Sequence, residues 1–214
     1  MADLDTAGGC GCTGNTARAE KDPAYRHALW IVVLLNLGFG AFEIVGGFMA
    51  DSQALKADSL DFIGDGTITL VALIALGWSM ASRARIALVQ GIFLLTLGLG
   101  VIGVAIWRAL TAIAPEADLM GGIGAAALLV NVLSALILSR FREGDANVRA
   151  VWLFSRNDAL ANVAVIVAAG LVAWTHSAWP DLAVAAVIAG LFLHSAYEIL
   201  RGARSELREL AQAA

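Results

Sequence analysis

The chain consists largely of long apolar stretches separated by short polar segments. Two of these stretches, residues 86–107 and 119–139, contain no charged residue. A run of about 18 or more apolar residues is typical of a helix that crosses a membrane, because about 20 helical residues match the thickness of the hydrocarbon core. The two stretches therefore predict transmembrane helices and place the chain among the integral membrane proteins.

Further stretches are apolar apart from a few polar side chains, and they cover residues 28–50, 57–81, 150–174 and 182–200. Each is of a length that can cross the hydrocarbon core as a helix. We therefore predict an all-α polytopic membrane protein with six transmembrane helices. An even number of spans places both termini on the same side of the membrane.

The composition supports this class and excludes others. Hydrophobic residues make up 59% of the chain and charged residues 15%, whereas about 25% of an average soluble domain is charged. The net charge is −4 and no long basic run occurs, so nothing indicates binding to nucleic acid. Six spans leave too little sequence for a soluble catalytic domain.

Lysine and arginine are distributed unevenly over the predicted topology. Cytoplasmic segments of membrane proteins carry an excess of these residues. One side of the topology carries the basic residues Arg18, Lys21, Arg26, Arg83, Arg85, Arg140, Arg142, Arg149, Arg201, Arg204 and Arg208. The other side carries only Lys56 and Arg108. We therefore predict that both termini are cytoplasmic.

The predicted domains follow from these spans. They are a flexible cytoplasmic tail at 1–26, a six-helix transmembrane domain at 27–200 and a short cytoplasmic tail at 201–214. The first tail holds Cys10 and Cys12 in a glycine-rich segment. Two thiolates can transiently hold a soft metal ion, but with no further ligand nearby a tail without function is the alternative.

Three aspartates interrupt the second apolar stretch, at positions 58, 61 and 65. At about 100° per residue, Asp61 and Asp65 point about 40° apart on a helix, and Asp58 lies within about 60° of both. One face of this helix is therefore a stripe of carboxylates. Ionisable groups inside a membrane are costly and indicate a functional site.

Polar pairs on two other spans repeat this pattern. Asp158 and Asn162 are four residues apart in the fifth stretch, and Asn36 and Glu43 are seven apart in the first. Each pair shares one helix face. For Asn36 and Glu43, hydrogen bonding between helices and a role near a site both remain open, and Asp58 is either a helix-start residue or part of an entry path.

Clustered carboxylates cannot all remain ionised and unpaired inside a membrane, so a cation must share their site. Asp61, Asp65, Asp158 and the amide oxygen of Asn162 provide four ligands for a divalent metal. Carboxylates accept protons when the metal leaves. The pattern therefore predicts a site that holds either a metal ion or protons.

Two segments resemble a known family. Residues 52–65, SQALKADSLDFIGD, resemble the second helix of the cation diffusion facilitators, in which a Ser-x-Ala-Leu start is followed by His or Asp and, four residues later, Asp. Residues 152–165, WLFSRNDALANVAV, are similar to the fifth helix of that family. The six spans, the cytoplasmic termini and the asparagine and glutamate of the first span also match, so the resemblance covers residues 26–208.

The resemblance implies a secondary transporter rather than an enzyme. Such a protein would sit in the plasma (inner) membrane as a multi-pass homodimer surrounded by lipid, and would export a divalent metal in exchange for protons by alternating access. Asp61, Asp65 and Asp158 would be metal ligands and proton acceptors. We expect no cofactor apart from the transported ion.

The choice of metal rests on two opposing arguments. Oxygen ligands without histidine favour harder ions such as Mn(II) or Fe(II). The family and the cysteine pair favour Zn(II) and Cd(II). We expect Zn(II) as the substrate, with Cd, Co, Fe(II) or Mn(II) as alternatives.

Two features depart from the family pattern. Phe154 stands where the family's fifth helix usually offers His or Asp, so the missing ligand must come from elsewhere. Asn162 is the first candidate, and Ser155, Asn36 or water are the others. The chain also ends soon after Leu200, where most members continue into a cytoplasmic metal-binding domain, so it resembles a short form.

Two other classes of protein remain open at this point. A membrane-embedded, metal-dependent lipid-head-group transferase also uses clustered aspartates, but its motif, Asp-x-x-Asp-Gly-x-x-Ala-Arg, requires glycine where Phe62 follows Asp61. A non-catalytic membrane scaffold would use the aspartates only to join helices.

Overall fold

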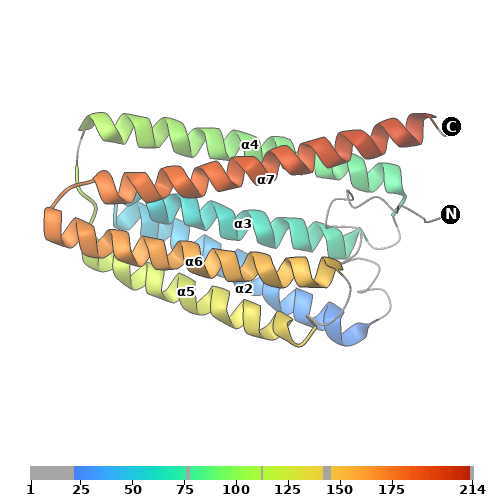
Figure 1. Cartoon of the computed structure of the whole chain (residues 1–214), viewed down its shortest axis with the longest axis horizontal. Coiled ribbons are helices and arrows are strands. Elements are labelled where there is room, and N and C mark those ends of the chain that lie inside the picture. Colours follow the sequence, from blue (N-terminus) through green and yellow to red (C-terminus); the bar gives the residue numbers. More distant parts are fainter. Residues whose placement is uncertain (1–21, 76–77, 112, 142–145, 213–214) are drawn as a thin grey trace, which may run out of the picture.

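The computed structural model describes residues 22–75, 78–111, 113–141 and 146–212, without the side chains of 72, 111 and 146–157. Cys10 and Cys12 lie outside the described residues. The described chain forms six helices, which are α2 (Pro23–Met49), α3 (Gln53–Ile74), α4 (Met80–Thr111), α5 (Ala117–Ser139), α6 (Ala146–Thr175) and α7 (Trp179–Gln212). They run side by side along one axis (Figure 1). The predicted all-α class is confirmed.

Helix α3 lies at the centre of the assembly. It contacts every other helix, whereas α2 contacts only α3 and α5 among the described elements. Helices α2, α3, α5 and α6 form one bundle, and α4 and α7 form a pair that packs on it (Figure 1). We call the end where α2 begins and α7 ends the termini end, and the other the opposite end.

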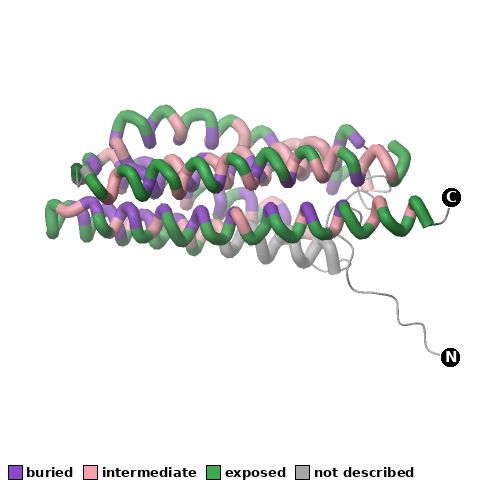
Figure 2. Tube along the Cα trace, turned by 90° about the horizontal axis from the view of Figure 1, so that it is seen from above, coloured by how far each residue is buried: buried purple, intermediate pink, exposed green. Residues whose placement is uncertain are grey.

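The outward faces of the helices are apolar. Five of the described helices have a segment that is long and apolar enough to cross a membrane, and α3 is the exception. Figure 2 shows exposed positions along the outer faces of the helices. The exposed large apolar side chains include Phe42, Leu129 and Leu136. Because α3 is surrounded by the others, its polar side chains need not face lipid. This position explains how α3 can be the sixth span predicted from the sequence.

Helices α4 and α7 extend farthest beyond the predicted spans. Helix α4 begins at Met80, and α7 continues through the predicted C-terminal tail to Gln212. The apolar stretches mark where a helix can lie in hydrocarbon. The hydrogen bonds of the helix backbone are internal, so a helix can continue into water.

The contact between α2 and α3 is close because Gly40 has no side chain. A Cβ atom at this position would lie 2.9 Å from Cγ1 of Ile63 and 3.1 Å from the backbone oxygen of Ser59. Real Cβ contacts are rarely this short, so a larger residue would separate the two helices. The glycine thus holds α2 against the acidic helix.

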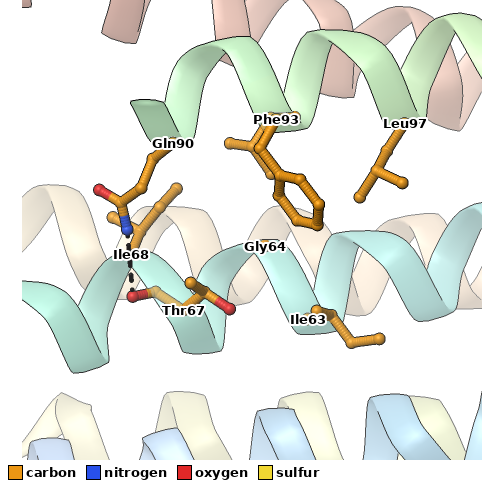
Figure 3. Close-up of a pocket in the computed structure, with 8 residues that line it drawn as sticks. Ile63, Gly64, Thr67, Ile68, Gln90, Phe93 and Leu97 are labelled. Atoms are coloured by element: carbon orange, nitrogen blue, oxygen red, sulfur yellow. Dashed lines mark hydrogen bonds between the residues drawn. The ribbon is translucent and has the colours of Figure 1, made fainter. Parts of the chain in front are cut away.

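The contact between α3 and α4 is looser. Gln90 of α4 donates a hydrogen bond from Nε2 to the backbone oxygen of Thr67, at 3.3 Å (Figure 3). Beside it lies a cavity of about 10 Å³ between Gly64 and Phe93, which is about the space of one water molecule. This hydrogen bond joins the centre of α4 to α3.

A polar network holds the connections together at the opposite end. Asp181 is buried at the start of α7 and accepts hydrogen bonds from Ser52 Oγ at 2.5 Å, Gln53 N at 2.8 Å and Ala54 N at 3.0 Å. Its carboxylate thereby satisfies free N–H groups in the first turn of α3. Asp181 thus fixes α3 to α7.

The connection between α2 and α3 is also held by ion pairs. Asp51 has a positive φ of 52°, which aspartate adopts more readily than most residues. Its carboxylate pairs with Arg108 of α4 and, at 3.4 Å, with Lys56. The two basic residues that the topology assigned to this side therefore stabilise its loop.

Candidate metal site

The central part of the site lies between α3 and α6, which contact each other. The carboxyl groups of Asp65 and Asp158 lie within hydrogen-bonding distance of each other. Two carboxylates have no proton to share, so they form such a bond only when one is protonated. Without a proton they repel, and a cation between them relieves that repulsion.

Asn162 lies one turn along α6 from Asp158 and is fully buried, with 0% exposure. Its Nδ2 donates a hydrogen bond to the backbone oxygen of Asp158 at 3.0 Å. A carbonyl only accepts, so this bond fixes which end of the amide is the nitrogen. The other end, Oδ1, is buried and has no hydrogen-bond partner among the described residues.

An orphaned buried oxygen is costly, at about 1–3 kcal/mol. One turn along α6 from Asp158, the Oδ1 atom of Asn162 adds an amide oxygen as a second type of oxygen donor. Carboxylate and amide oxygens both bind divalent cations. The chemistry of the residues present therefore fits a divalent metal ion.

Asp61 is the predicted ligand that stands apart. It lies close enough to Asp65 and Asp158 for their charges to repel. However, no three His, Cys, Asp or Glu side chains converge as a preformed metal cage in the described part of the chain. The structure thus brings Asp65 and Asp158 together, with Asn162 one turn away along α6 and Asp61 one turn away along α3.

Asn36 lies on α2 against the same part of α3. Its Cβ is 3.2 Å from the position that a Cβ on Gly66 would occupy, directly after Asp65 in the chain. The side chain is buried, and its Oδ1 has no hydrogen-bond partner among the described residues. Asn36 therefore lies near the site. The side chain of Ser155 is outside the described residues.

Glu43 and Asp58 form a second acidic pair nearer the opposite end. They are 0% and 1% exposed, and their carboxyl groups lie within hydrogen-bonding distance of each other. Both Glu43 oxygens and Oδ2 of Asp58 lack a donor among the described residues. The pair therefore needs a proton or a cation between its members, and it lies on the side of the site that faces the opposite end.

Two buried polar residues of α5 were missed by the sequence interpretation. Asn131 and Ser134 lie on the buried face of α5, and Ser134 Oγ has no partner among the described residues. A Cβ on Gly46 of α2 would meet Ile123 of α5. The two helices are antiparallel, so about ten residues before Gly46 and about ten after Ile123 the chain places Asn36 level with Ser134. The signal was their spacing, because Asn131 is four residues from Ala127 and Ser134 is four residues from Leu138, which places both on the face of these apolar residues.

The fold and these buried oxygen atoms define a polytopic helical membrane protein with an acidic site between α3 and α6. Residues 29–208 match the family model described as the cation efflux transmembrane domain, and the chain belongs to this family. The resemblance to the cation diffusion facilitators is therefore confirmed.

Several relatives with names of metal transporters match most of the chain. The zinc transporter ZitB of Escherichia coli (strain K12) is 32% identical over 189 residues, covering 82% of this chain and 60% of the relative. The cadmium, cobalt and zinc/H(+)-K(+) antiporter of Bacillus velezensis is 29% identical over 202 residues, covering 86% and 63%. The cation efflux protein CzcD of Cupriavidus metallidurans is 26% identical over 194 residues, covering 85% and 61%.

The chain spans about 60% of the length of the relatives that it matches. Their names are those of transporters, and none is the name of a lipid-head-group transferase or of a scaffold. The comparisons therefore support neither of the two alternative classes.

Proposed function

We propose that this protein exports divalent transition-metal cations and takes up protons in exchange, by alternating access to a site formed by Asp61, Asp65, Asp158 and Asn162. The observation that supports this most directly is the pair of facing carboxyl groups of Asp65 and Asp158, beside the orphaned oxygen of Asn162. This group can hold one divalent cation or, after the cation leaves, protons.

The proposed substrate is Zn(II), with Cd(II) as a second substrate. The support is the naming of ZitB as a zinc transporter and of the Bacillus velezensis relative as a cadmium, cobalt and zinc antiporter. The oxygen-only ligand set also suits Fe(II) and Mn(II). Cobalt, iron and manganese are therefore included in the test below.

The proposed location is the plasma (inner) membrane, with both termini cytoplasmic. Export of a doubly charged ion against an inside-negative potential of about 100 mV costs about 4.6 kcal/mol, at about 2.3 kcal/mol per charge. Protons that move inward offset this cost, which is the energetic reason for coupled exchange.

We propose that two copies of the chain associate through their transmembrane helices. His194 and Glu198 are exposed on α7, within the stretch predicted to lie in the membrane. Ionisable side chains in a membrane usually face a protein partner or water rather than lipid. A second copy that packs on α7 at the level of His194 and Glu198 would supply that partner.

The test is uptake of Zn(II), Co(II), Fe(II) and Mn(II) into proteoliposomes with an imposed pH gradient. We expect movement of zinc that depends on the gradient and is lost in Asp65→Ala. The matched control is Asp118→Ala, which removes an exposed carboxylate at the start of α5 and should transport normally. If the folded wild-type protein moves no ion, the proposal is wrong.

A further inference from the structure

The pair formed by α4 and α7 projects past the other helices at the termini end (Figure 1). The two helices have 32 and 34 residues, so each is about 50 Å long at 1.5 Å per residue, whereas the hydrocarbon core is about 30 Å thick. The first turns of α4 and the last turns of α7 therefore lie in the head-group region or beyond it.

A groove of about 660 Å³ opens along this projecting part. Leu95 and Leu200 contribute apolar side chains to it, and Tyr197 lies beside them. Arg201, Arg204 and Arg208 line the part nearer to the end of α7. The groove thus changes from apolar to basic along the direction that leads out of the membrane.

The three arginines share one face of α7. Their spacing of three and four residues keeps them within about 60° of each other. All three are exposed, and none of them takes part in an ion pair found among the described residues. Glu209 is the one acidic residue that lines the groove, so its charge is positive.

We propose that this groove binds the head group of an anionic phospholipid. Basic pockets between transmembrane helices at the membrane surface attract such head groups, and the planar guanidinium of arginine binds phosphate oxygens in pairs. The apolar part fits the upper acyl chains, and tyrosine favours the interface between lipid and water. The change from apolar to basic fits a lipid better than a soluble anion.

The site is independent of the proposed transport function, because its residues are not among those of the carboxylate site. Its test is therefore a binding measurement on the full chain in detergent. Native mass spectrometry would count bound phosphatidylglycerol and, as a neutral reference, phosphatidylcholine.

We expect the wild-type chain to retain phosphatidylglycerol in preference to phosphatidylcholine. The triple variant Arg201→Gln, Arg204→Gln, Arg208→Gln should bind phosphatidylglycerol at least about tenfold more weakly. The corresponding triple lysine variant keeps the charges and should retain most of the binding. Because the arginines are exposed, the changes should leave the fold intact, and circular dichroism would check this.

The control carries Arg26→Gln, Arg85→Gln and Arg140→Gln. These arginines are also exposed and belong to the same side of the topology, but they do not line the groove. An equal loss of phosphatidylglycerol binding in the control would show that the loss depends on net charge alone, and would overturn the proposal.

Two other outcomes would also overturn it. Displacement of the lipid by millimolar inorganic phosphate would indicate a site for a soluble anion. Dissociation of a dimer in the groove variant, with unchanged lipid binding, would indicate that a second copy of the chain covers the groove.

Discussion

Replacement of Asn162 by leucine should change metal binding and stability in different ways. Leucine has the same four side-chain heavy atoms branched at Cγ as asparagine, with the larger volume of two methyl groups, so the fully buried position stays filled. The change removes the orphaned Oδ1 atom, whose burial costs about 1–3 kcal/mol. It also removes the hydrogen bond from Nδ2 to Asp158, which is worth about 0.6 kcal/mol on average within a membrane.

The two effects on the free energy of unfolding have opposite signs, and removal of the orphaned oxygen is the larger. We therefore expect the metal-free Asn162→Leu protein to be as stable as the wild type, or more stable by about 1–2 kcal/mol. Metal affinity should fall by at least about tenfold, because loss even of a group that supports a ligand costs about 10- to 100-fold.

The measurements are thermal unfolding of the metal-free chain in detergent and competition of a chelator for bound Zn(II). The matched control is Asn131→Leu on α5, which removes another buried amide outside the proposed ligand set. It should affect zinc affinity much less than Asn162→Leu. A clear loss of stability in Asn162→Leu with unchanged zinc affinity would show that the amide only joins parts of the fold, and would refute the reasoning.

Three further changes test the rest of the structure. Asp61→Ala or Asp158→Ala should abolish metal transport while the protein stays in the membrane, and normal transport by either variant in proteoliposomes would contradict its role as a ligand. Asp181→Ala should destabilise the fold by about 3 kcal/mol, because it leaves three buried donors without their acceptor. Thermal unfolding would measure this loss, with Asp118→Ala as the control, since Asp118 is exposed and its loss should change stability little. Gly40→Leu should cost about 1–3 kcal/mol, because its side chain would meet the backbone of α3; an unchanged unfolding temperature would show that this contact is not close.

The clustering of the acidic residues could be predicted from local spacing. Asp58, Asp61 and Asp65 share a helix face at any depth in the membrane, and that face must avoid lipid. Such a face requires neighbouring helices on that side of α3, and the structure supplies them. The same argument placed Asp158 and Asn162 opposite it.

The pairing between helices could not be predicted in this way. Whether Asp61 or Asp65 meets Asp158 depends on the depth and rotation of α3 relative to α6. These are set by contacts such as Gly40 against Ser59, which involve residues far apart in the sequence. Asp181 is a clearer case, because its partner Ser52 is 129 residues away and nothing near Asp181 in the chain indicates that it caps another helix.

The polar residues of α5 show a further limit of reasoning from composition. Asn131 and Ser134 are uncharged, so they do not interrupt the apolar stretch that predicts the span. A single asparagine or serine is also common in membrane helices as a hydrogen-bonding contact. What distinguishes Ser134 is that its oxygen lacks a partner and is level with the orphaned oxygen of Asn36. Because such an oxygen is costly unless a water molecule or an ion reaches it, these residues extend the polar interior from α2 and α3 to α5 at the level of Asp65.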